Sequence, residues 1–190
     1  VALDLVAGPS EIMIIADASA NPAYIAADML SQAEHGSGRE QAVLLSTEPA
    51  LLPQVAAQLQ RQSAGLSRSD CLAKVLANGV FLLETASLQE AVELANRYAP
   101  EHLELMLQDP EPTAARITAA GAIFLGHWTP EPVGDFVAGP SHVLPTGGSG
   151  RFFTGLTAEM FFRRSSLVKY DRTALERELP YIRCFAASEG

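Results

Sequence analysis

The sequence predicts an α/β fold, in which a Rossmann-like, mostly parallel sheet with helices on both faces precedes a small, mainly helical C-terminal appendage. Two observations carry this prediction. Short apolar runs with β-branched residues, such as 11–16 and 41–46, have the composition of strands buried on both faces. Segments with helical spacing of apolar residues separate them, and strands that alternate with helices form parallel sheets through right-handed crossovers.

The first strand and helix are the most clearly marked. Residues 11–16 read Glu-Ile-Met-Ile-Ile-Ala, and Asn21-Pro22 then supplies a helix cap followed by proline in the first turn. We expect the helix over 22–35, because Gly36 readily takes the left-handed conformation that ends many helices. Gln32 and His35 would then be neighbours on its last turn.

The same alternation continues to residue 125. In order, we expect a strand over 41–46, a helix through Leu51, Val55, Ala56 and Leu59, a helix around 71–76 that stops at Asn78-Gly79, a strand over 80–83, a helix over 87–98, a short strand over 102–106, a helix over 113–120 and a strand over 122–125. The last strand is expected to be buried. No GxGxxG motif follows any strand, so the usual dinucleotide fingerprint is absent.

Residues 126–153 break this pattern. They are rich in proline and glycine and contain His127, Trp128, Asp135 and His142. We assign no role to His127, Trp128 or His142. A loop of this length is usually functional or disordered, and its apolar residues favour an ordered active-site loop. We therefore predict a Rossmann-like domain over 1–153 and an appendage over 154–190. The appendage is expected to be helical over 156–164, extended over 166–170, and helical over 173–187 with a break at Pro180.

The composition limits the function classes. Of the 190 residues, 48% are hydrophobic and 18% charged, which is typical of a globular protein. The net charge is −9 and the 13 basic residues are scattered, whereas nucleic-acid binding needs clustered lysine and arginine. No apolar run approaches the roughly 20 residues that cross a bilayer. The sequence therefore predicts neither a nucleic-acid nor a membrane partner.

The cysteines and the chain ends give further expectations. Cys71 and Cys184 are the only cysteines and do not form a disulfide framework or a CxxC motif. The N-terminus lacks a basic n-region, so no signal peptide is predicted and the expected location is cytoplasmic. Because the sequence starts without methionine inside a strand-like run and stops abruptly after Glu189, we expect a fragment of a longer protein.

Four segments carry polar residues at element ends or in loops, where α/β proteins build their sites. They are Ser10 after Gly8-Pro9, Gln32 with His35, Glu101-His102 after Pro100, and Asp135 with His142. In addition, residues 4–10 (DLVAGPS) recur as 135–141 (DFVAGPS) with one difference. Gly-Pro-Ser fits a tight turn that presents a hydroxyl group, and we interpret the repeat as equivalent loops of two related halves.

The chemistry of these residues allows several functions. Carboxylate, imidazole and amide oxygen form a mixed N/O set that suits zinc or a similar divalent metal. Glu101-His102 is a candidate acid/base pair, although adjacent residues on an extended chain point to opposite faces. Taken alone, Gln32 and His35 also fit a solvated helix end, where a histidine suits the helix dipole. A metal-dependent hydrolase and a non-catalytic dimerisation or binding domain remain open as alternatives.

Four longer segments in the same order are similar to signature segments of the histidinol dehydrogenase family: 7–11 (AGPSE), 31–35 (SQAEH), 99–104 (APEHLE) and 134–146 (GDFVAGPSHVLPT). The resemblance runs along the whole chain. It implies a homodimeric zinc enzyme of histidine biosynthesis that oxidises L-histidinol through an aldehyde to L-histidine with two NAD.

The resemblance also implies roles for individual residues. Gln32, His35 and Asp135 would be zinc ligands that also hold the substrate, and Glu101 and His102 would be the acid/base residues, with His102 also contacting the substrate. Ser10 and Glu189 would complete substrate binding. The family's NAD contacts lie upstream of this sequence, and a further zinc-ligand histidine follows the Glu-Gly pair with which it ends. We therefore expect these 190 residues alone to bind zinc weakly and to lack dehydrogenase activity.

Overall fold

The computed structural model describes residues 8–67 and 69–190. The chain divides into two compact units, residues 1–157 and 158–190, and each is described here by itself. Within the described residues, no helix combines the length and the apolar composition needed to cross a membrane. The candidate site residues treated below, apart from Glu189, belong to the first unit.

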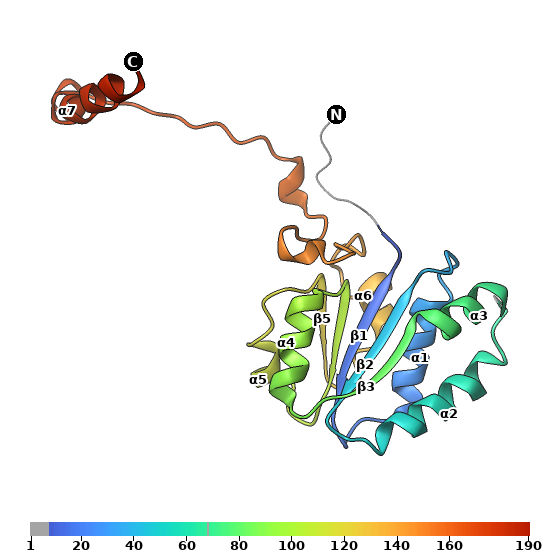
Figure 1. Ribbon diagram of the computed structural model, residues 1–190. Helices are drawn as coiled ribbons and strands as arrows, with labels where there is room; N and C mark the ends of the chain where they lie inside the picture. Colours follow the sequence, from blue (N-terminus) through green and yellow to red (C-terminus); the bar gives the residue numbers. More distant parts are fainter. Residues whose placement is uncertain (1–7, 68) are drawn as a thin grey trace. The chain divides into compact units, whose positions relative to one another are not determined.

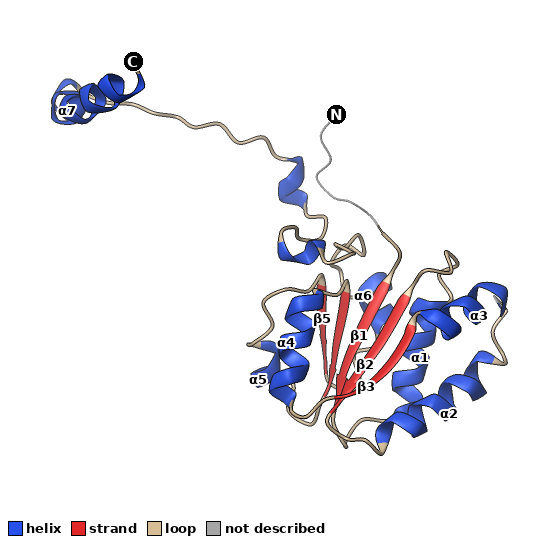
Figure 2. Ribbon diagram, viewed as in Figure 1, coloured by secondary structure: helices blue, strands red, loops and turns tan. Residues whose placement is uncertain are grey.

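The first unit is built on one parallel sheet (Figure 2). Its strands are β1 (Glu11–Ala16), β2 (Gln41–Ser46), β3 (Val80–Glu84), β4 (His102–Met106) and β5 (Ala122–Leu125). They lie in the order β3-β2-β1-β4-β5, and every neighbouring pair is parallel. This is the order of the first five strands of a Rossmann sheet, so the predicted α/β fold is confirmed.

Helices cover both faces of the sheet (Figure 1). On one face, α1 (Pro22–Ala33), α2 (Leu51–Ser63) and α3 (Ser69–Asn78) pack against side chains such as Ile12 and Ile14. On the other, α4 (Leu88–Tyr98) and the segment that contains α5 (Glu111–Ala114) pack against Met13 and Ile15. Because side chains alternate along β1, one apolar strand supplies both hydrophobic cores.

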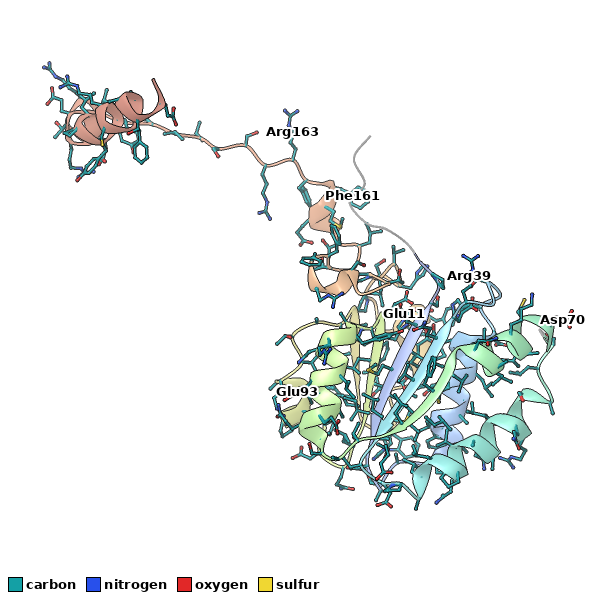
Figure 3. All side chains as sticks on the ribbon, viewed as in Figure 1. Glu11, Arg39, Asp70, Glu93, Phe161 and Arg163 are labelled. Atoms are coloured by element: carbon teal, nitrogen blue, oxygen red, sulfur yellow. The ribbon has the colours of Figure 1, made fainter. Side chains whose placement is uncertain are left out.

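The register places His102 opposite Ile12, and therefore on the α1 face at the point where β4 begins. Helix α1 starts after the carboxyl end of β1, so its own last turn returns to the edge of the sheet where the strands begin. We call this edge the amino edge and the opposite one the carboxyl edge. Figure 3 shows Glu11 at the amino edge, at the start of β1.

Several predicted boundaries are wrong. Helix α1 ends at Ala33 rather than at residue 35, so His35 lies in the turn before Gly36, whose φ is 105°. The helix predicted over 113–120 is the single turn α5 over Glu111–Ala114. There, the Asn96 side chain accepts a hydrogen bond from the Thr118 N–H and donates one to the Arg116 carbonyl, which holds this backbone outside a helix.

Two further predictions need correction. Strand β5 is an edge strand in which only Phe124 is buried, because nothing in the described residues pairs with its outer side. The loop over 126–153 contains a short helix, α6 (Glu131–Phe136), and a 3-10 turn (Ser149–Arg151). Pro130 and Pro132 preset the backbone for this first turn, a signal that the loop prediction passed over.

The second unit contains a 3-10 turn (Ala158–Phe161) and α7 (Arg172–Glu189). Only this 3-10 turn forms within the helix predicted over 156–164. Helix α7 is capped by Asp171, whose carboxylate accepts the Ala174 N–H, and it continues through Pro180, where a break was predicted. The predicted domain boundary at 153/154 stays a prediction.

Candidate active site

His102 is the central side chain of the amino edge. It opens β4 and is 4% exposed. Its Nδ1 lies 3.0 Å from the Glu11 carbonyl oxygen, which can only accept a hydrogen bond, so in the neutral ring Nδ1 carries the proton and Nε2 the lone pair. Burial lowers the pKa of His102, which favours this neutral form. Nε2 itself is buried and has no hydrogen-bond partner within the described residues.

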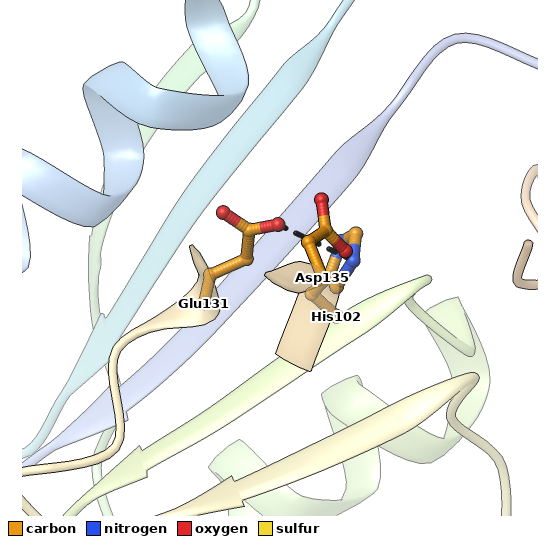
Figure 4. A group of neighbouring side chains, drawn as sticks. All are labelled: His102, Glu131 and Asp135. Atoms are coloured by element: carbon orange, nitrogen blue, oxygen red, sulfur yellow. Dashed lines mark ion pairs between the residues drawn. The ribbon is translucent and has the colours of Figure 1, made fainter. Parts of the chain in front are cut away.

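Two carboxylates from α6 meet this nitrogen (Figure 4). Glu131 Oε1 lies 3.7 Å from His102 Nε2, and one ligand atom each from His102, Glu131 and Asp135 lie within 4.8 Å of one another. Burial raises the pKa of Glu131 to about 7, the charge of Asp135 adds to the rise, and a 3.0 Å hydrogen bond from Ser31 Oγ opposes it. Glu131 therefore loses its proton near neutral pH.

Glu101 lies on the other side of the His102 ring. Its Oε2 accepts the Glu11 N–H at 2.9 Å and lies 3.6 Å from His102 Nδ1. Burial raises the pKa of Glu101 to about 7, and the charges of Glu11, Asp135 and Glu131 raise it further against the backbone hydrogen bond. Because Glu101 precedes the strand, the alternation of an extended chain does not separate these adjacent side chains, and the Glu101 carboxylate lies beside the His102 ring.

Glu11 ties the long loop to the sheet. Its Oε1 accepts the Gly147 N–H at 3.0 Å, while its backbone N–H and carbonyl serve Glu101 and His102. Burial raises the pKa of the Glu11 carboxyl group. One residue at the start of β1 thus positions the loop and both members of the candidate acid/base pair.

Helix α1 contributes Gln32 and the turn that follows it. Gln32 is fully buried, yet neither its amide oxygen nor its amide nitrogen has a hydrogen-bond partner among the described residues. His35 is exposed, and its Nδ1 lies 3.2 Å from the Ser31 carbonyl oxygen, so Nε2 is left with the lone pair. His35, Glu131 and Asp135 line one pocket of about 340 Å³.

The remaining predicted site residues lie elsewhere or are less constrained. Ser10 directly precedes β1 at the amino edge, and its carbonyl accepts the Gln41 N–H at 3.1 Å. His142 is exposed and lines a separate pocket of about 350 Å³ that also contacts Asp135. Glu189 belongs to the second unit, so its role in substrate binding stays a prediction.

The repeated heptad is only partly described. Residues 135–141 run from the last turn of α6 to a turn at Gly139, whose φ is 99°. In the first copy, residues 4–7 lie outside the described residues, so the interpretation as equivalent loops stays a prediction.

The donors of this edge fit a zinc ion. Carboxylate, imidazole and amide oxygen are suitable ligands, and an amide as deeply buried as that of Gln32 normally has a partner. The start of α1 does not suit NAD in the same way. The turn between β1 and α1, residues 17–21, contains no glycine, and the side chain of Asn21 already accepts the Ala23 N–H that a phosphate group would need.

Sequence reasoning missed three acidic residues here: Glu11, Glu104 and Glu131. Glu131 had a readable signal, because a Pro-Glu-Pro turn starts a helix in which Glu131 and Asp135 are four residues apart on one face. Glu104 gave none, since a single acidic residue within a short apolar strand does not reveal what faces it.

Comparisons with known proteins agree on one family. The family model described as histidinol dehydrogenase matches residues 1–190. The histidinol dehydrogenases of Heliobacterium mobile and Desulfotalea psychrophila are 45% and 46% identical to 99% and 100% of this chain. The crystal structure of histidinol dehydrogenase from Elizabethkingia anophelis superimposes over 100% of the chain with a TM-score of 0.93 at 36% identity. The chain spans 44% of each of the two sequence relatives and 43% of the crystallised chain.

Proposed function

The chain belongs to the histidinol dehydrogenase family, and on that basis we propose that it carries the metal and acid/base site of an NAD-linked enzyme that oxidises L-histidinol through the aldehyde to L-histidine. One observation supports this most directly. At the amino edge, His102 Nε2, which has no hydrogen-bond partner among the described residues, meets the carboxylates of Glu131 and Asp135. The last turn of α1 brings to the same edge the Gln32 amide, which is fully buried and has no hydrogen-bond partner in the described part of the chain.

We assign Gln32, His35 and Asp135 to zinc and to the substrate groups around it. Bound zinc would supply a Lewis acid that orients the imidazole and amine nitrogens of histidinol. His35 Nε2 is available because Nδ1 faces the Ser31 carbonyl oxygen, and Asp135 lines the same pocket. Ser10 and Glu189 are the further substrate-binding residues of the proposal, with the Glu189 carboxylate suited to an ammonium group.

His102 and Glu101 would handle the protons. The Glu11 carbonyl holds the His102 ring with its lone pair on Nε2, so this atom can accept the proton of the substrate alcohol. Glu101, with a pKa raised to about 7, can take a proton from the water that adds to the aldehyde and return one near neutral pH. Both residues also act without forming a covalent bond to the substrate.

The hydride acceptor would be bound outside the residues described here. Nothing in the 17–21 turn suits a dinucleotide, and the relatives are more than twice as long as this chain. We therefore assign no residue of the chain to NAD and expect the 190 residues alone to bind zinc weakly and to turn over no histidinol. A homodimer in the cytoplasm is part of the same proposal.

The test is an assay of the complete enzyme with L-histidinol and NAD. We expect NADH absorbance to rise, zinc removal by a chelator to abolish it, and Glu101→Gln and His102→Asn to reduce it with zinc still bound. Hydrolysis of ester or amide substrates without NAD, and no NADH from histidinol, would instead favour the metal-dependent hydrolase.

A further inference from the structure

A third pocket lies between α1 and the segment that leads from β5 into α6. Its volume is about 400 Å³, and its lining residues are Tyr24, Ala27, Asp28, His127, Trp128, Pro130 and Val133. None of these residues lines the pocket of His35, Glu131 and Asp135. The two pockets are therefore separate, and the proposed dehydrogenase reaction leaves this one without a role.

Aromatic rings form two walls of the pocket. The ring centroids of Tyr24 and Trp128 are 6.0 Å apart, and the ring planes are tilted by 57°. Trp128 is 82% exposed, which is unusual for so large an apolar side chain. An exposed tryptophan that packs on a tyrosine beside a hollow offers its π-face to a ligand, because that face carries negative electrostatic potential.

An acidic group lies in the same pocket. Asp28 is one helical turn after Tyr24 on α1 and is only 6% exposed. Its carboxyl group interacts with that of Glu104, which is 1% exposed, and the backbone N–H of Glu131 also acts on the Glu104 carboxyl group. Two buried carboxyl groups thus face each other without a cationic partner.

Of these two carboxyl groups, Asp28 is the one that carries the negative charge. Burial raises the pKa of Glu104 well above its usual range, and the charge of Asp28 raises it further, so Glu104 keeps its proton. Burial raises the pKa of Asp28 only to about 6, so its carboxyl group is ionised at neutral pH. No lysine or arginine of the described chain lines the pocket, and His127 directs Nε2 to Ser19 Oγ at 3.1 Å.

We propose that this pocket binds a small organic cation, an ammonium or imidazolium group with an apolar body. Its charge would pair with the Asp28 carboxylate, its body would contact Ala27, Pro130 and Val133, and its positive edge would lie on the Tyr24 and Trp128 rings. Cation–π contact and a largely desolvated carboxylate both favour a cation over a neutral molecule of the same shape. The inference does not depend on the proposed reaction.

Trp128 makes the proposal directly testable, because an exposed tryptophan that lines the pocket reports binding by its fluorescence. The complete protein is titrated with tetramethylammonium chloride, with sodium chloride at equal ionic strength and with tert-butanol as the neutral molecule of the same shape. We expect a saturable change in tryptophan fluorescence with tetramethylammonium alone, and its loss in Trp128→Phe identifies the reporter. Calorimetric titration of the same variants measures binding without fluorescence.

Two variants then test the pocket from opposite sides. Asp28→Asn keeps the shape and removes the charge, and we expect the affinity to fall about tenfold or more. Trp128→Leu removes the exposed wall without touching the core, and we expect a loss of several-fold. Glu93→Gln, at an exposed position of α4, is the matched control and should bind like the unchanged protein. Equal binding of tert-butanol, unaltered calorimetric affinity in both pocket variants, or no saturable binding at all would overturn the proposal.

Discussion

The two edges of the same sheet differ in how their polar groups are used. At the carboxyl edge, Asp17 accepts hydrogen bonds from the Ser19 hydroxyl group and from the backbone N–H groups of Gln108 and Ser19, and these bonds lower its pKa despite burial. At the amino edge, His102 Nε2, Glu131 Oε1 and both polar atoms of the Gln32 amide are buried without hydrogen-bond partners among the described residues, whereas the carboxyl ends of β3 and β5 carry only Thr85 Oγ1 and His127 Nδ1 as such atoms. Polar groups that the fold itself satisfies are structural, whereas buried orphans point to a ligand.

This difference runs against the usual position of α/β sites. Open parallel sheets normally bind ligands at the carboxyl ends of their strands, near the point where the strand order reverses. Here that point lies between β1 and β4, and on its carboxyl side the Asp17 carboxylate joins the segments that follow the two strands by accepting the Gln108 N–H. The site forms at the opposite edge because α1 returns there with Gln32 and because α6 brings Glu131 and Asp135 over the start of β4.

The largest expected effect comes from the residues on either side of strand β4. His102→Asn removes the proton acceptor at the amino edge, and we expect kcat for histidinol oxidation to fall roughly 100- to 10,000-fold. Asp109→Asn, just beyond the carboxyl end of the same strand, should leave kcat unchanged. Zinc content is measured alongside. Comparable losses in both variants would show that the edges do not differ in the way described.

Zinc affinity should separate two possible ligand sets at the amino edge. We expect His35→Asn to weaken zinc binding by at least about 100-fold, since loss of even an outer partner of a metal ligand costs about 10- to 100-fold. Glu131→Gln should cost less than about tenfold and mainly reduce kcat. Competition with a chromogenic chelator measures both. The reverse order would assign the metal to His102, Glu131 and Asp135 instead.

In the metal-free protein, the carboxyl groups at the two edges should change the free energy of unfolding with pH in opposite directions. The pKa values of Glu101 and Glu131 are raised from 4.5 to about 7, so the folded state binds more protons than the unfolded state between these values. The free energy of unfolding should therefore fall as pH rises through this window. Because the two carboxyl groups interact and do not titrate independently, we expect a total decrease of roughly 2 kcal/mol rather than the sum of two separate shifts. Urea unfolding at a series of pH values measures this decrease.

Substitutions at each edge check the sign of this effect. Glu131→Gln should reduce the decrease and stabilise the metal-free protein at pH 8. Asp17 has a lowered pKa, so its contribution is present above the unfolded value and is lost as pH falls through the folded one. Asp17→Asn should therefore destabilise the protein at pH 8. A common sign for the two variants would contradict the electrostatic difference between the edges.

The smallest effect should come from a pair of serines. Ser31→Ala removes the hydrogen bond that stabilises the Glu131 carboxylate, so the pKa of Glu131 should rise and the acid limb of the kcat/KM profile should move to higher pH. The plateau value should stay within about threefold. Ser19→Ala, at the carboxyl edge, should not move the profile. An unshifted acid limb in Ser31→Ala would remove Glu131 from the groups that control activity.

The sheet was predictable because its strands are short, apolar and β-branched. Residues 11–16, 41–46 and 102–106 form strands as expected, and Ser87 and Asn21 cap the helices that follow them in the predicted places. The burial of β5 was not predictable, because an apolar run is the same whether its outer neighbour exists or not. Likewise, only tertiary contacts with Asn96 explain why 115–120 is not helical.

The sequence by itself determined which residue types stand at the element ends: Gln32 and His35 after the first helix, Glu101-His102 before a strand, and Asp135 in the long loop. Local propensity and family resemblance are sufficient to identify these residues and their places in the chain. Only the tertiary structure decided that Asp135 meets His102 through a short helix carrying Glu131, that Glu11 positions the acid/base pair, and that Asp28 faces Glu104 beside Trp128. These contacts join residues far apart in the chain, and burial and proximity, which spacing does not encode, shift their pKa values.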